Sequence, residues 1–153
     1  MGKNTIKSYH TGSVKKSIII KASKQQVWRK ISNVVGLPLW VIDVKKTIYL
    51  SKKKRGIGAI REITFNDGNT IEEHFVLWKN GECFTYVATE GLPLRAYVAT
   101  ISISAKTKNS TRITWESYLN SKKMTEKEFL EFLVYIGTFY EASLENLKNS
   151  FEK

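Results

Sequence analysis

The sequence is poor in three features that would each assign it to a special class: cysteine, proline and long apolar runs. Among 153 residues there are one cysteine, Cys83, and two prolines. A single cysteine excludes an internal disulfide framework and is typical of a reducing compartment. No apolar run approaches the roughly 18 residues that a membrane-spanning helix needs, and residues 1–16 lack the apolar segment of a secretory leader. We therefore expect a cytoplasmic protein without a transmembrane segment.

Acidic residues are also scarce relative to basic ones. The chain has 25 Lys and Arg against 14 Asp and Glu, which gives a formal net charge of +11. Clusters of basic residues in such a chain can bind an acidic partner such as RNA or an anionic surface. A solvated, lysine-rich surface is the alternative, favoured because most of the excess is Lys, whereas Arg is the residue of bidentate phosphate recognition. The candidate residues for such a partner are Lys45, Lys46, Lys52, Lys53, Lys54 and Arg55.

What is present is typical of a folded domain. Hydrophobic residues make up 42% of the chain and aromatic residues 12%, which argues against disorder. The length suits one domain over residues 1–153. A β-branched strand is predicted over Val14–Ala22, so that residues 1–13 form a flexible or extended N-terminal segment.

Two short helices are expected after this strand. Ser23 with Gln26 has the spacing of a capping box, and the helix that it starts ends near Asn33. The segment Val34–Trp40 contains Gly36 and Pro38 and is interpreted as a second, bent helical piece.

The middle of the chain is almost entirely strand. Turn residues at 66–69 and at Asn80-Gly81 are typical of tight hairpins. Thr125 with Glu128 forms a second capping box, followed by a 3.6-residue apolar stripe to Phe151. The predicted strands are Val44–Leu50, Ile57–Phe65, Thr70–Trp78, Cys83–Glu90, Tyr97–Ala105 and Thr111–Leu119.

This order predicts an α+β helix-grip fold. Sequential strands joined by short turns form an antiparallel meander, here of seven strands. Such a sheet curls through its twist, and the long C-terminal helix has the apolar stripe needed to fill the concave face.

An Arg–Glu pair on that concave face is the sharpest chemical feature. Alternation places Arg61 on the more apolar face of its strand, and it places Glu73 beside Phe75 and Leu77 on the equivalent face of the next strand. The 66–69 turn brings Arg61 and Glu73 within one residue of register. Two interpretations stay open: a structural ion pair in the core, or polar groups in a solvated cavity.

Other site types find little support. The two histidines and Cys83 show no zinc-ligand spacing. Gly56-Ile57-Gly58 has Arg61 where a dinucleotide fingerprint needs its third glycine. We therefore expect no metal and no cofactor.

The chain resembles the START/Bet v 1-type helix-grip superfamily (SRPBCC), and most closely its polyketide cyclase/dehydrase-like branch. The resemblance covers nearly everything from Val14 onward and implies the fold just described. It rests on Ser17–Ser23 with Val27-Trp28, Leu39-Trp40, Gly56–Arg61, Ile71–Glu73, Tyr86, Leu92-Pro93 with Tyr97, and Thr114-Trp115.

Plant abscisic acid receptors are similar over several of these positions. The resemblance implies that Arg61, Glu73, Tyr97 and Glu116 line a pocket, with Lys46 as a guess for the pocket lysine. Alternation disagrees for Glu116, because Trp115 and its apolar neighbours form the buried face of that strand. The receptors' mobile gate loop is replaced here by the tight 66–69 hairpin, so no hormone-receptor function is inferred.

The leading hypothesis is storage, transport or sensing of a small hydrophobic or lipid-like ligand between sheet and helix. Gly91–Leu94 and Gly36–Trp40 would border the entrance. One alternative is a cyclase/dehydratase-like enzyme acting on such a ligand, and another is a ribosome-, RNA- or chaperone-associated module that uses the basic surface. The candidate ligand-binding residues are Arg61, Glu73, Phe75, Tyr86, Tyr97, Glu116, Phe129, Phe132, Leu133 and Ile136.

Overall fold

The computed structural model describes residues 9–152, and its element order matches the prediction. Two helical pieces follow the first strand, the second being a single 3₁₀ turn, and a long helix closes the chain. The elements are β1 (His10–Ile20), α1 (Lys24–Ile31), η1 (Leu37–Leu39), β2 (Val44–Tyr49), β3 (Ile60–Phe65), β4 (Thr70–Lys79), β5 (Cys83–Glu90), β6 (Ala96–Thr107), β7 (Ser110–Ser121) and α2 (Glu126–Phe151).

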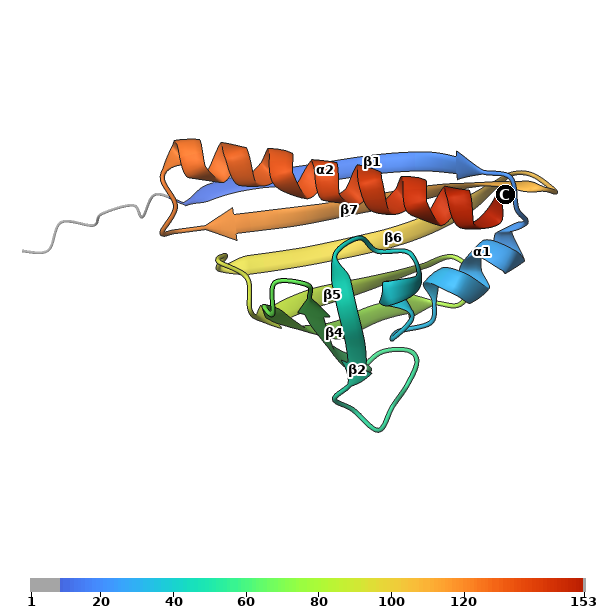
Figure 1. Ribbon diagram of the computed structural model, residues 1–153, viewed down its shortest axis with the longest axis horizontal. Coiled ribbons are helices and arrows are strands. Elements are labelled where there is room, and N and C mark those ends of the chain that lie inside the picture. Colours follow the sequence, from blue (N-terminus) through green and yellow to red (C-terminus); the bar gives the residue numbers. More distant parts are fainter. Residues whose placement is uncertain (1–8, 153) are drawn as a thin grey trace, which may run out of the picture.

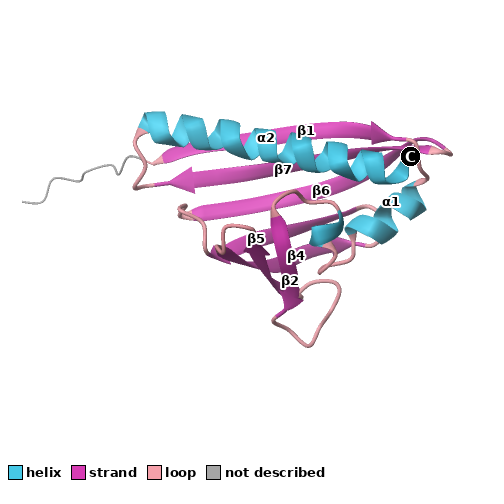
Figure 2. Ribbon diagram, viewed as in Figure 1, coloured by secondary structure: helices cyan, strands magenta, loops and turns pink. Residues whose placement is uncertain are grey.

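All seven strands form one antiparallel sheet in the order β1-β7-β6-β5-β4-β3-β2. Strands β2 to β7 pair with their neighbours in sequence, and β1 pairs with β7 at the other edge of the sheet. The sheet curls, and α2 runs over β1 and β7 on its concave side (Figure 1). The helices lie on one side of the sheet (Figure 2). The predicted α+β helix-grip fold is therefore confirmed.

Local sequence signals account for the helix starts. The Ser23 hydroxyl accepts the Gln26 backbone N–H while the Gln26 side chain accepts the Ser23 backbone N–H. Thr125 and Glu128 form the same reciprocal pair at the start of α2. Each box satisfies two backbone N–H donors that have no acceptor within the helix. Such a cap stabilises the helix by about 1 kcal/mol.

Two strand starts differ from the prediction by three residues or more. Strand β1 begins at His10, because the ladder with β7 extends to the His10–Ser121 pair. Residues 10–13 are thus extended, and the earlier part of the predicted N-terminal segment lies outside the described residues. Strand β3 begins at Ile60 instead of Ile57, because Gly56 and Gly58 have φ of 83° and 94°, which a regular strand excludes.

The surroundings of the buried face of α2 change along the length of the helix. Toward its C-terminus, Leu144 and Leu147 are almost completely buried against the sheet. Nearer its N-terminus, one face of the helix lines a cavity instead, through Phe132, Tyr135, Ile136, Phe139 and Tyr140. Within the described part of the chain, no helix is both long and apolar enough to cross a membrane.

Candidate functional site

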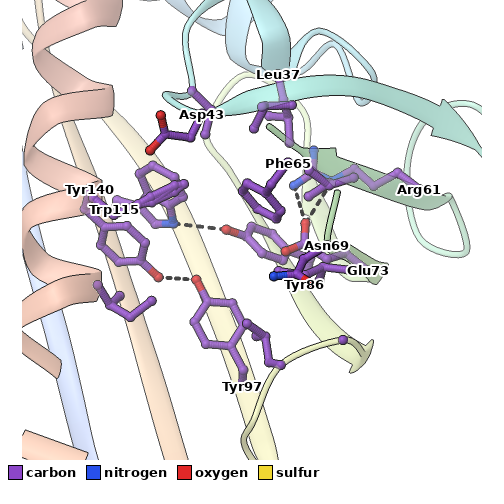
Figure 3. Close-up of a pocket in the computed structure, with 18 of the residues that line it drawn as sticks. Leu37, Asp43, Arg61, Phe65, Asn69, Glu73, Tyr86, Tyr97, Trp115 and Tyr140 are labelled. Atoms are coloured by element: carbon purple, nitrogen blue, oxygen red, sulfur yellow. Dashed lines mark hydrogen bonds and ion pairs between the residues drawn. The ribbon is translucent and has the colours of Figure 1, made fainter. Parts of the chain in front are cut away.

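A cavity of about 480 Å³ lies between the concave face of the sheet and the N-terminal half of α2. Most of its wall is aromatic or aliphatic, with a few polar groups from the sheet, from its turns and from α2 (Figure 3). The apolar part of the wall includes Leu37, Trp40, Val41, Val44, Ile63, Phe65, Ile71, Phe84, Leu92, Ile101, Trp115, Phe132, Ile136 and Phe139.

Arg61 and Glu73 form a buried ion pair at one end of this cavity. The two residues are directly opposite in the β3–β4 ladder, so that the predicted pairing is confirmed. Glu73 Oε1 accepts from Arg61 Nε at 2.9 Å and lies 2.7 Å from Arg61 Nη2. Arg61 Nη1 donates to the Val34 carbonyl oxygen at 3.0 Å. Only 3% of the Arg61 side chain and 7% of the Glu73 side chain are exposed.

Aromatic rings complete the surroundings of the guanidinium. The Arg61 Cζ atom is 4.8 Å from the Phe75 ring centroid and 5.0 Å from that of Tyr86, within the range of cation–π attraction. Burial raises the pKa of Glu73 above its ordinary value, and the adjacent Arg61 guanidinium opposes that rise. The pair is thus held together in a place where an unpaired charge would be costly.

Three tyrosines supply hydroxyl groups to the same cavity. The Tyr86 hydroxyl accepts from Trp115 Nε1 at 3.1 Å, and the Tyr97 and Tyr140 hydroxyls are hydrogen-bonded to each other (Figure 3). The Trp115 and Tyr140 rings stack with centroids 4.0 Å apart. Burial raises the pKa of each of the three tyrosines well above its usual range. At neutral pH these groups are therefore neutral phenols that can donate hydrogen bonds.

Two turns and η1 border the cavity, close to the entrance expected from the sequence. Leu37 of η1 and Leu92 of the β5–β6 loop contribute to its lining, as does the β3–β4 turn. Two hydrogen bonds hold that turn in place: Asn66 N–H donates to the Asp43 backbone carbonyl, and Asn69 N–H donates to the side-chain Oδ1 of Asp67.

The structure brings six of the ten predicted site residues together around the cavity: Arg61, Glu73, Tyr86, Tyr97, Phe132 and Ile136. Phe75 lies behind Arg61 in the core, with its ring centroid 5.4 Å from that of Phe84. Phe129 and Leu133 are also outside the cavity lining. Both side chains pack against Gly12 of β1, because α2 crosses that strand. One part of the apolar stripe of α2 therefore contacts β1, and another part faces the cavity.

The structure corrects two placements that the resemblance implied, those of Glu116 and Lys46 in the pocket. Ile113, Trp115 and Leu119 are buried along β7, whereas Glu116 is exposed on the opposite face of the sheet. Strict alternation therefore places Glu116 correctly, and its placement inside the pocket is wrong. Lys46 is exposed and is absent from the cavity wall.

The sequence interpretation missed several wall residues that carried a usable signal. Tyr140 lies one helical turn after Ile136 on the same stripe, and Trp115 was already assigned to the buried face of its strand. Trp40, fully buried at the end of η1, also lines the cavity. Asp43 carried no such signal: its φ of 61° turns the chain there, at the start of β2.

The basic residues lie away from this cavity. Lys45 and Lys46 are exposed on the edge strand β2, and residues 52–55 are exposed in the loop that follows it. Arg55 reaches back to the body of the protein, with its guanidinium 5.5 Å from the Trp78 ring centroid. Within residues 9–152 no group of His, Cys, Asp and Glu is arranged to hold a metal ion.

A curled antiparallel sheet that encloses a cavity against its C-terminal helix defines a helix-grip protein. The model of the family "Polyketide cyclase / dehydrase and lipid transport" matches residues 11–152, and the chain belongs to that family. A comparison with curated protein sequences gives no match.

Solved structures share the fold at low sequence identity. An uncharacterised protein from Bacillus thuringiensis is 22% identical with a TM-score of 0.80, over 93% of this chain and 100% of that one. A START superfamily protein from Mycobacterium smegmatis is 14% identical with a TM-score of 0.76, over 92% and 97%. The Zhui aromatase/cyclase from Streptomyces sp. R1128 is 14% identical with a TM-score of 0.77, over 94% of each chain.

Proposed function

We propose that this protein binds a small hydrophobic or lipid-like ligand in the cavity between the sheet and α2, for storage, transport or sensing. The observation that carries the proposal is the cavity itself. Its volume of about 480 Å³ lies within the roughly 300–1,000 Å³ typical of ligand pockets. An apolar wall with a few convergent polar groups is the usual composition of such sites.

The family description agrees with this proposal, since it includes lipid transport. It also names cyclases and dehydrases, and catalysis on the bound ligand is the alternative that it raises. The likeness to an aromatase/cyclase at 14% identity concerns the fold. Binding is therefore the function that we propose from the cavity, and turnover would be a further property of the same site.

A cavity-filling variant tests the proposal. Ile136 lines the cavity, and Val134 on the same helix is 70% exposed. Ile136→Trp should fill part of the space, while Val134→Trp adds the same side chain on the outside. The probe is the neutral fluorophore N-phenyl-1-naphthylamine, and thermal unfolding shows whether each variant is folded.

We expect saturable binding by the wild type and by Val134→Trp, and binding at least about tenfold weaker by Ile136→Trp. Native mass spectrometry of the purified wild type should also show a reproducible bound molecule. Equal binding by a folded Ile136→Trp variant, or no saturable binding by any form, would contradict the proposal.

A second candidate function concerns the loop between β2 and β3, for which we propose an anionic lipid surface as partner. Lys52, Lys53 and Lys54 are exposed in this loop, and none of them is in an ion pair with another residue of the described chain. Ile57 in the same loop is 58% exposed. Cations beside an exposed aliphatic side chain suit a lipid surface better than RNA, which offers no apolar layer.

Vesicle sedimentation tests this surface. Wild-type protein should bind vesicles containing phosphatidylserine and not pure phosphatidylcholine, and salt should weaken the binding. The variant Lys52→Glu with Lys53→Glu should lose it, whereas Lys106→Glu with Lys108→Glu, an equal charge change in the exposed β6–β7 hairpin, should retain it. Binding to RNA without binding to vesicles would assign the surface to a different partner and overturn this candidate.

A further inference from the structure

The net charge of the residues that line the cavity has the opposite sign to the net charge of the whole protein. Three carboxylates, Asp43, Asp67 and Glu73, line the cavity together with one cation, Arg61. No lysine or histidine of residues 9–152 contributes to the lining, although the chain as a whole has a net charge of +11. A ligand that enters therefore leaves a basic surface for an acidic wall.

The single cation is already paired with a carboxylate. Nε and Nη2 of Arg61 both point at Glu73 Oε1, and Nη1 donates to the Val34 carbonyl. The rings of Phe75 and Tyr86 lie against the guanidinium. A ligand carboxylate beside Arg61 would therefore meet a cation whose charge Glu73 already balances, and it would also lie close to the like charge of Glu73.

The other groups at this end have unused hydrogen-bonding capacity. Glu73 Oε2 accepts no hydrogen bond from any described residue, so it is available as an acceptor. The Tyr86 hydroxyl accepts from Trp115 and keeps its own proton to donate.

We propose that the cavity selects a neutral, mostly apolar molecule that carries a hydroxyl group, and that it rejects a carboxylate of the same size. The ligand hydroxyl donates to Glu73 Oε2 and accepts from the Tyr86 hydroxyl. A hydroxyl is the simplest neutral group that can do both. The proposal rests on the binding function proposed above, and it adds the chemical class of the ligand.

Three matched probes test this selection by displacement of N-phenyl-1-naphthylamine: 2-naphthol, its methyl ether 2-methoxynaphthalene, and 2-naphthoate. All share one ring system and differ in the polar group. Because a hydrogen bond to a charged acceptor is among the stronger ones, we expect 2-naphthol to bind about tenfold or more tightly than the ether. We expect 2-naphthoate to bind more weakly than both.

Two variants assign the preference to the named groups. Tyr86→Phe keeps the ring and removes only the hydroxyl that donates to the ligand oxygen, so 2-naphthol and the ether should both bind several-fold more weakly. Glu73→Gln removes the negative charge, so that binding of 2-naphthoate should improve; thermal unfolding reports whether this variant folds. The Tyr86→Phe result stands by itself if Glu73→Gln does not fold.

The outcomes separate this inference from the proposed function. If no probe displaces the fluorophore and the fluorophore itself does not bind, the proposed function fails. If the fluorophore binds but 2-naphthoate binds as tightly as 2-naphthol, the ligand class is wrong while the binding function stands. Unchanged binding of 2-naphthol by a folded Tyr86→Phe variant would also overturn the inference.

Discussion

Removing Arg61 from the buried pair gives a prediction whose size can be worked out from the structure. In Arg61→Leu, Glu73 remains buried at the cavity wall and loses the one group that lowers its pKa. Breaking a buried ion pair from one side costs about 3–5 kcal/mol of unfolding free energy. The variant should therefore lose about this amount near neutral pH.

Part of that cost must depend on pH, because Glu73 can take up a proton instead of remaining charged. Holding a carboxyl protonated costs about 1.4 kcal/mol for each pH unit above its ordinary pKa, and that ordinary value is 4.5. The cost of protonating Glu73 sets an upper limit on this penalty of about 3 kcal/mol near pH 7 and of less than about 1 kcal/mol near pH 5. The lost hydrogen bond to Val34 adds about 1 kcal/mol at either pH.

The sign follows from proton binding. Above about pH 4.5 the folded variant keeps a proton on Glu73 that the unfolded chain releases, so its stability falls as pH rises until the raised pKa of Glu73 is passed. In the wild type Arg61 limits the rise of this pKa, so the same change is smaller.

Urea unfolding at about pH 5 and about pH 7 measures the difference. We expect the loss in Arg61→Leu, relative to wild type at the same pH, to be larger at the higher pH by about 1–2 kcal/mol. The double variant Arg61→Leu with Glu73→Leu removes the titrating group and serves as the control, and its loss relative to wild type should not grow at the higher pH. An equal loss at both pH values in Arg61→Leu itself would refute the reasoning, because it would mean that Glu73 is not the group left uncompensated.

Other predictions concern the helix cap, the cavity mouth and the tyrosine pair. Thr125→Ala should lower the unfolding free energy by about 1 kcal/mol in urea titrations, through loss of the α2 cap; no change would mean that the cap does not contribute. Gly91→Ala should cost more than about 1 kcal/mol, because φ is 99° and the new Cβ would lie 2.0 Å from the Thr70 carbonyl oxygen; a neutral result would show that this loop can move. Tyr97→Phe should cost about 1 kcal/mol through loss of its bond to Tyr140, and a stabilised variant would contradict that bond.

Much of the fold was predictable because two short-range rules set it. The hairpin turn at 66–69 determines the β3–β4 register, and alternation then turns Arg61 and Glu73 to the same side. The limits appear where strands are irregular. Leu77 was expected on the buried face with Phe75, but a register shift between these two residues leaves Leu77 exposed and turns Trp78 toward the core. No residue type at that point signals a bulge.

The site was less predictable than the fold for a geometric reason. A helical stripe shows which residues are buried, but it does not show which element each one meets. Phe129 and Leu133 share the stripe with Phe132 and Ile136, yet the first two contact β1 and the others line the cavity. That division depends on where α2 crosses the curled sheet, which is a property of the tertiary structure.

The proposed discrimination between hydroxyl and carboxylate has two physical sources that salt can separate. Asp43 and Asp67 are exposed at the cavity border, whereas Glu73 is buried. Salt at about 0.5 M shortens the Debye length to roughly 4 Å, and it screens exposed charges far more than buried ones. The basic outer surface, which would attract anions, is screened in the same way. If Glu73 is the selecting group, the preference for 2-naphthol over 2-naphthoate should therefore persist at high salt. A preference that disappears with salt would assign the selection to the two exposed carboxylates at the border, and Glu73 would then be a structural partner of Arg61 alone.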